Sequence, residues 1–119
     1  MGKYNARLRY YVGDSLEEIR QQDLDRIGDA EGVEISFERV DHRNAGPGIR
    51  EEETMGKPLE EITQDVITID CDDETKFRNA IQAIYEKYRS PRTPYSFWGS
   101  SRHGERIAKR IANETGGGW

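Results

Sequence analysis

The feature that most constrains the fold is a hydrophobic pattern of helical period directly after a short apolar segment. Residues 66–71, VITIDC, are β-branched and apolar on both faces, which predicts a central strand. Asp72 or Asp73 is then placed to cap a helix. The apolar residues that follow recur at intervals of three and four, which indicates one face of an amphipathic helix. They are Phe77, Ala80, Ile81, Ile84, Tyr85 and Tyr88.

Two earlier segments, residues 6–12 and 33–40, alternate between apolar and polar side chains. A period of two predicts a strand with one buried face. Between them, residues 15–18 read SLEE, the pattern of a capping box. This pattern predicts a helix from Leu16 to about Ile27. Beyond the prolines at 91 and 94, Ser100 or Ser101 is placed to cap a last helix that runs to about Asn113.

The predicted order of elements is strand, helix, strand, long loop, strand, helix, helix. Its first part resembles the start of a ferredoxin-like split βαβ domain in which the final strand is replaced by a loop and a helix. We therefore predict an α+β fold: an incomplete ferredoxin-like βαββα antiparallel sheet with helices on one face and an extra C-terminal helix. Three strands leave open edges, so we also expect a homo-oligomer or a partner strand.

The length of 119 residues predicts one domain, which we place at residues 1–115 with a flexible tail at 116–119. Residues 42–64 hold three glycines, two prolines and three successive glutamates, which predicts a long mobile loop. No run of about 18 apolar residues is present, so we expect no membrane partner. A single cysteine fits a reducing compartment, and we expect a cytoplasmic protein.

Residues 89–110 carry a charge opposite to that of the remaining chain. They hold six Lys or Arg against one acid, a net charge of +5, whereas the whole chain has −5 and the remainder therefore −10. Three aromatic rings and several hydroxyl groups lie in the same stretch. An acidic body argues against duplex DNA, because non-specific duplex binders are basic overall. A basic patch on such a body fits a small anionic ligand or a partner protein.

These residue types suit a ligand that carries phosphate. Arg102, Arg106 and Arg110 are spaced four apart and share one helix face, where guanidinium groups donate in pairs to phosphate oxygens. The unpaired amides at the helix start can hold a phosphate, and a preceding ring can stack a base. The candidate ligand-binding residues are Arg92, Tyr95, Phe97, Trp98, Ser100, Ser101, Arg102, His103, Arg106 and Arg110.

The same stretch also has a purely structural interpretation. Phe97 and Trp98 would fill the core where the missing fourth strand would lie. The arginines would form a solvated helix face, with Glu105 pairing to Lys109 at i+4. A third interpretation is a protein-contact surface, because aromatic residues and arginines are enriched at interface hot spots.

Catalytic and metal-binding interpretations are weaker. Residues 70–74, DCDDE, could hold Mg²⁺ at a strand end, with Asp41 as a further carboxylate, but helix capping explains the same acids. Cys71, His42 and His103 are too few and too scattered for a zinc site. We expect Cys71 to be a core residue. The sequence favours binding over catalysis, and we expect neither a cofactor nor a metal.

The expected function is that of a small non-enzymatic protein. It would bind a nucleotide or another phosphorylated small molecule through the C-terminal patch, and could sequester a signalling nucleotide in the manner of a viral accessory protein. The alternative is an interaction module or inhibitor that binds a partner protein through the same patch and an acidic loop. The exposure of Trp98 separates these interpretations from the structural one.

Overall fold

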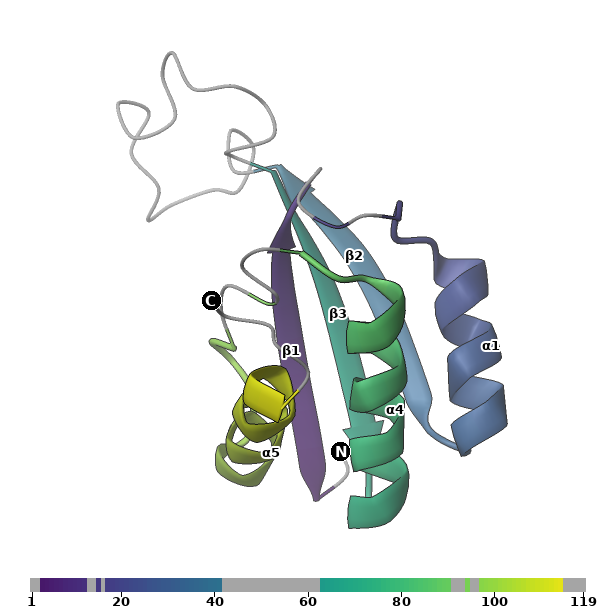
Figure 1. The fold of residues 1–119 in the computed structure, drawn as a ribbon, viewed down its shortest axis with the longest axis vertical. Coiled ribbons are helices and arrows are strands. Elements are labelled where there is room, and N and C mark those ends of the chain that lie inside the picture. Colours follow the sequence, from purple (N-terminus) through teal and green to yellow (C-terminus); the bar gives the residue numbers. More distant parts are fainter. Residues whose placement is uncertain are drawn as a thin grey trace.

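The computed structural model describes residues 3–12, 15, 17–41, 63–90, 94 and 97–114. Its three strands form one sheet in the order β1-β3-β2, and β3 is antiparallel to both neighbours. All three helices cover the same face of this sheet (Figure 1), so the predicted α+β fold is confirmed. The elements are β1 (Tyr4–Tyr11), α1 (Gln21–Glu31), β2 (Glu34–Asp41), β3 (Thr63–Cys71), α4 (Glu74–Lys87) and α5 (Arg102–Glu114).

The core lies between β3 and the helices. In the register of the sheet, Ile69 pairs with Ala6 of β1 and with Ile35 of β2, and all three side chains are buried. The central position predicted for 66–71 is confirmed, but β3 already begins at Thr63. Residues 63 and 64 therefore belong to the strand and not to the predicted loop 42–64. Residues 42–62 of that loop and the predicted tail 116–119 lie outside the described residues.

The first helix is shifted from its predicted position of 16–27. α1 begins at Gln21, and its N-cap residue Arg20 makes no side-chain capping bond. The hydroxyl of Ser15 instead donates to the carbonyl oxygen of Glu17 at 2.6 Å, so the predicted capping box does not form. Ile19 is buried ahead of the helix. Burial of that side chain fixes the segment against the core in place of a first helical turn. The helix ends at Glu31, and Gly32 follows as its C-cap residue (φ 72°).

The last two helices agree with their hydrophobic patterns. Asp73 caps α4 by accepting from the backbone amide of Lys76 at 3.0 Å. The hydroxyl of Tyr85 on α4 donates to the carbonyl oxygen of Ala108 on α5 at 3.2 Å. Burial raises the pKa of Tyr85 well above its usual value, so this donor stays protonated. Gly104 brings α5 so close to β1 that a Cβ atom there would overlap the carbonyl group of Asn5.

Two serines cover the outer edge of β1. The backbone amide of Asn5 donates to Ser101 Oγ at 3.1 Å, and the amide of Ser101 donates to the carbonyl oxygen of Asn5 at 3.0 Å. The amide of Arg7 donates to Ser100 Oγ at 2.8 Å. An open strand edge presents unpaired backbone groups. On this edge the serine hydroxyl groups bond the backbone of Asn5 and Arg7, where a complete ferredoxin-like sheet would add its fourth strand.

Candidate functional site

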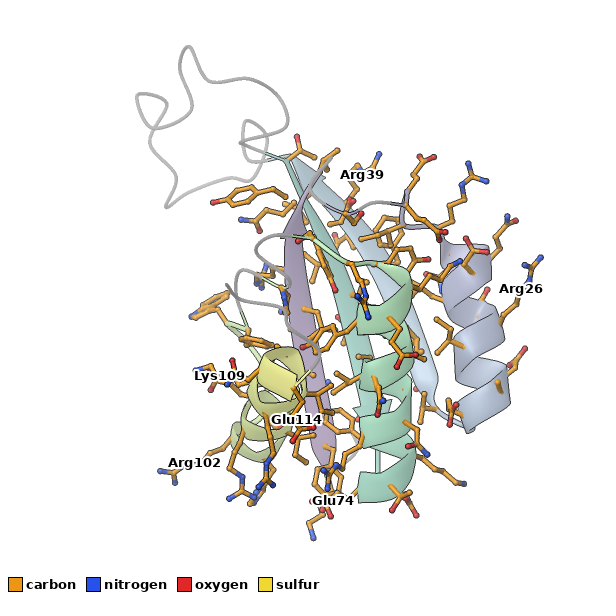
Figure 2. All side chains as sticks on the ribbon, viewed as in Figure 1. Arg26, Arg39, Glu74, Arg102, Lys109 and Glu114 are labelled. Atoms are coloured by element: carbon orange, nitrogen blue, oxygen red, sulfur yellow. The ribbon has the colours of Figure 1, made fainter. Side chains whose placement is uncertain are left out.

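Helix α5 presents a row of cationic side chains on the side opposite its buried stripe. Arg102, Arg106, Lys109 and Arg110 are exposed. Figure 2 shows Arg102 and Lys109 pointing away from the body of the protein. The row exists because the apolar residues recur at helical spacing and dock the helix against the core. The buried residues of this stripe are Ile107, Ala108, Ile111 and Ala112.

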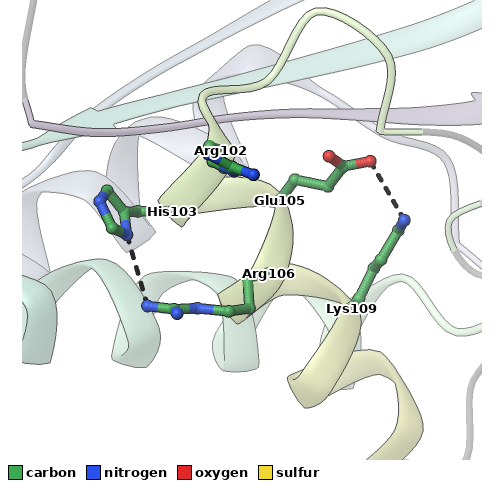
Figure 3. Close-up of a pocket in the computed structure, with 5 residues that line it drawn as sticks. All are labelled: Arg102, His103, Glu105, Arg106 and Lys109. Carbon is green, nitrogen blue, oxygen red and sulfur yellow. Dashed lines mark hydrogen bonds and ion pairs between the residues drawn. The ribbon is translucent and has the colours of Figure 1, made fainter.

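A first hollow of about 660 Å³ lies on this exposed face of α5. Figure 3 shows its lining residues, with Arg106 directed toward His103 and Glu105 toward Lys109. Arg106 Nη2 lies 3.3 Å from His103 Nδ1, and Lys109 Nζ lies 3.1 Å from Glu105 Oε1. Because a guanidinium group only donates, His103 Nδ1 accepts in this contact. The hollow is lined by Arg102, His103, Glu105, Arg106 and Lys109.

A second hollow of about 500 Å³ lies between α4 and α5. Arg106 lines this hollow as well as the first, so the two share one guanidinium group. The sequence analysis did not include Arg78, which comes from α4. Arg78 lies near the cations of α5 only because α4 packs against α5. No sequence pattern within one helix predicts that packing. The lining residues are Glu74, Arg78, Arg106, Ile107 and Arg110.

Four arginines thus form one surface, which we call the arginine face: Arg78, Arg102, Arg106 and Arg110. Of these, Arg110 has a nearby carboxylate, with its Nε 3.9 Å from Glu114 Oε1. Within the described residues, Arg78, Arg102 and Arg106 have no carboxylate oxygen within 4.0 Å. The two adjoining hollows together are lined by these four arginines and Lys109 against Glu74 and Glu105, so cations outnumber carboxylates and the site has a positive potential.

The two candidate serines serve the fold in this structure. Ser101 Oγ accepts from the amides of Asn5 and Gly104 and donates to the carbonyl oxygen of Asn5. Ser101 thereby caps α5, as the sequence predicted. The amide of Glu105 donates to the carbonyl oxygen of Ser101 at 2.8 Å. The start of α5 therefore lies against β1, so we centre the site on the arginines instead of the helix start.

The aromatic residues take two different positions. Phe97 is half-buried and packs against the core, with Lys109 Nζ 5.9 Å from its ring centroid. Trp98 is 76% exposed. Its ring lies 5.4 Å from Arg9 Cζ, and Arg9 Nε donates to its carbonyl oxygen at 3.3 Å. Trp98 lines neither hollow, so the structure groups Arg102, His103, Arg106 and Arg110 but sets Trp98 beside β1.

The other candidates have structural partners or lie outside the described residues. Arg92, Tyr95 and His42 belong to the undescribed part of the chain. Asp72 Oδ1 accepts from the amide of Lys3 at 2.9 Å, and Cys71 is partly buried against the core. Among the residues that the structure describes, no group of three or more His, Cys, Asp or Glu side chains is arranged to hold a metal ion.

Comparison with protein-family models, with curated proteins and with solved structures finds no match. None of the helices in the described segments combines the length and apolar character that crossing a membrane requires.

Proposed function

We propose that this protein binds a phosphate-bearing small molecule, a nucleotide or another phosphorylated compound, at the arginine face and holds it without chemical change. One observation carries the proposal. Arg78, Arg102 and Arg106 surround two adjoining hollows without a carboxylate partner in the described residues, although the chain as a whole has a net charge of −5. Glu74 and Glu105 line the same hollows, yet among the described residues no carboxylate oxygen comes within 4.0 Å of these three guanidinium groups, which favours an external anion.

The chemistry of the arginines supports holding an anion. Gathering like charges on one surface costs free energy, and a phosphate group placed among them offsets that cost. Each guanidinium group offers two parallel N–H donors that match the spacing of phosphate oxygens. Arginine keeps its proton under all ordinary conditions, so it serves as a fixed donor and not as a proton-transfer group. These properties favour capture of a ligand over its conversion.

An interaction surface for another protein is the second candidate, and the exposure of Trp98 is the observation that favours it. Exposed tryptophan and arginine are both enriched at interface hot spots. In that case an acidic segment of the partner would bind the arginine face, and small anions would add little stability. The two functions therefore differ in their response to free phosphate compounds.

The test is the thermal stability of the protein in the presence of inorganic phosphate, pyrophosphate, and mono-, di- and cyclic nucleotides. A ligand at about one hundred times its dissociation constant adds about 2.7 kcal/mol, enough to raise the melting temperature by several degrees. Arg106→Glu should abolish the shift. Arg26→Glu is the matched control, because Arg26 is exposed on α1, far from α5 (Figure 2).

A wild-type protein that shows no shift with any of these anions would contradict the proposal. An equal shift in wild type and Arg106→Glu would place the anion elsewhere on the surface. Loss of the shift in both Arg106→Glu and Arg26→Glu would indicate a non-specific response to net charge.

A further inference from the structure

The position of Trp98 has a consequence for the size of the ligand. If the arginine face binds phosphate as proposed above, we infer that the natural ligand is a short single-stranded nucleic acid. Its backbone follows the arginines of α5, and one of its bases stacks on Trp98. This inference rests on the proposed function and extends it from one phosphorylated group to a chain of several.

Trp98 is held in its exposed position by a defined turn. The amide of Ser100 donates to the carbonyl oxygen of Phe97 at 3.0 Å, and Gly99 takes the left-handed φ of 90° that this turn requires. A Cβ atom on Gly99 would lie 3.0 Å from Arg7 Cδ, so the turn packs closely on β1. Arg9 contacts both the ring and the carbonyl group of Trp98. A ring held this way is preorganised to stack another flat ring.

A series of contacts joins Trp98 to the arginine face. Phe97 precedes Trp98 in the chain, and its ring lies 5.9 Å from Lys109 Nζ. Lys109 lines the first hollow, and Arg106 extends that hollow into the second. The path from Trp98 to Arg78 therefore has aromatic rings at one end and mainly cations along the remainder, where Glu105 and Glu74 are its acidic residues. This combination of a stacking ring and a cationic track suits single-stranded nucleic acid.

The length of the path argues for more than one nucleotide. Eight residues of helix separate Arg102 from Arg110, which corresponds to about 12 Å along the axis. Trp98 lies four residues before Arg102, beyond the N-terminal end of the helix, so the path is longer than this axial distance. A mononucleotide has one base and one phosphate ester close together, so it cannot stack on Trp98 and also contact all three arginines along about 12 Å of helix. Successive arginines of α5 are about 6 Å apart along the helix, so each can meet a different phosphate of one strand.

The experiment measures binding of fluorescein-labelled single-stranded dT8 by fluorescence anisotropy, with competition by dTMP, pyrophosphate and a duplex of the same length. We expect dT8 to bind at least tenfold more tightly than dTMP. Trp98→Ala should weaken dT8 binding about tenfold, because one stacked base is lost, and leave pyrophosphate binding unchanged. Arg106→Glu should weaken both, and Arg26→Glu should weaken neither.

The salt dependence gives an independent measurement. Each phosphate contact to single-stranded nucleic acid contributes a slope of about −0.7 in a plot of log affinity against log salt. Contacts from Arg102, Arg106 and Arg110 predict a slope of about −2 for dT8, and Arg106→Gln should reduce its magnitude by about 0.7.

Equal affinities for dT8 and dTMP, or an unchanged affinity for dT8 in Trp98→Ala, would overturn the inference. Binding of pyrophosphate and dTMP without binding of dT8 would overturn it as well, but would leave the proposed function standing. Equal binding of duplex and single strand would exclude the stacked base. Absence of binding by every one of these anions would reject the proposed function together with this inference.

Discussion

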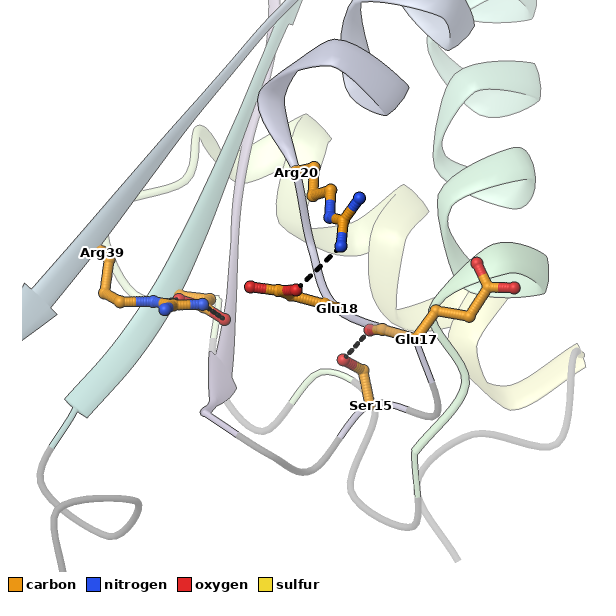
Figure 4. A network of polar contacts seen from close by, with 6 residues as sticks. Ser15, Glu17, Glu18, Arg20 and Arg39 are labelled. Atoms are coloured by element: carbon orange, nitrogen blue, oxygen red, sulfur yellow. Dashed lines mark hydrogen bonds and ion pairs between the residues drawn. The ribbon is translucent and has the colours of Figure 1, made fainter.

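Two polar regions of this protein use the same residue types in opposite ways. At the corner beside the start of α1, each of the cations drawn in Figure 4 lies next to a carboxylate. Arg39 Nε is 2.7 Å from Asp65 Oδ1, and Arg20 Nη2 is 3.2 Å from Glu18 Oε2. On the arginine face, Arg78, Arg102 and Arg106 have no such neighbour among the described residues.

The difference lies in what each cation neutralises. Asp65 is only 4% exposed and depends on Arg39 to compensate its buried charge. The hydrogen bond from Arg39 to Asp65 holds the pKa of the guanidinium group above its usual value. The corner is thus electrostatically complete within the protein. On the arginine face, Glu74 and Glu105 line the hollows, but no carboxylate oxygen of the described residues lies within 4.0 Å of Arg78, Arg102 or Arg106. Under the proposed function, an anion from outside would bind there.

The largest expected effect concerns the attachment of α5 to the sheet. Gly104→Ala should lower the free energy of unfolding by about 3 kcal/mol, because the added Cβ atom would overlap the carbonyl group of Asn5 and push α5 away from β1. Urea denaturation measures this change. Asn113→Ala, at an exposed position of the same helix, should be nearly neutral. Wild-type stability in Gly104→Ala would show that α5 is not held as closely as the structure indicates.

A smaller loss is expected at the paired corner. Arg39→Met should destabilise the protein by about 2 kcal/mol, because it leaves the Asp65 carboxylate buried without its partner; the value is below that of a fully buried pair since Arg39 is partly exposed. Adding Asp65→Asn should restore part of the loss, since the unpaired charge is removed. A stability change in Arg39→Met no larger than that of Arg26→Met, measured by the same denaturation, would contradict the distinction between the two regions.

The sequence alone was sufficient to predict the helices and strands whose positions are determined by local residue patterns. The spacing of apolar residues placed α4 and α5, and the β-branched residues of 66–71 identified the central strand. The start of α1 was predicted wrongly because the capping-box pattern competes with burial of Ile19, which depends on tertiary packing. The capping-box residues near position 15 contain no information on whether Ile19, further along the chain, will be buried in the core.

The candidate site was predictable only in part. Helical spacing alone grouped Arg102, Arg106 and Arg110 on one face. Arg78 was missed because it comes from another helix. Trp98 was grouped with the arginines because sequence proximity does not show that its ring lies beside Arg9 of β1 and outside the linings of both hollows. The serines were assigned to a ligand because the sequence predicts open sheet edges but does not show that Ser100 and Ser101 cover the edge of β1.

A loss of stability smaller than that at the paired corner is expected at the outer edge of β1, where Ser100 and Ser101 bind. Ser101→Ala removes the cap of α5 and the hydroxyl group that bonds both the amide and the carbonyl group of Asn5. It should lower the free energy of unfolding by about 1 kcal/mol. Ser100→Ala should cost less, because Ser100 does not cap the helix. Chemical denaturation of both variants tests this order. If the serines instead bound a phosphate, Ser101→Ala would reduce anion affinity and leave stability nearly unchanged.

The smallest expected effect has the opposite sign and tests the comparison most directly. Arg106→Glu should leave the free energy of unfolding unchanged or raise it by up to about 0.5 kcal/mol in the absence of ligand. A glutamate at this position would lie one helical turn from Arg102 and from Arg110, and such pairs contribute about 0.2–0.5 kcal/mol. It would also relieve repulsion from Arg78 across the second hollow. The same variant should lose anion binding, so stability and binding change in opposite directions. A clear destabilisation by Arg106→Glu would mean that this arginine supports the fold as Arg39 does, and the two regions would then not differ in kind.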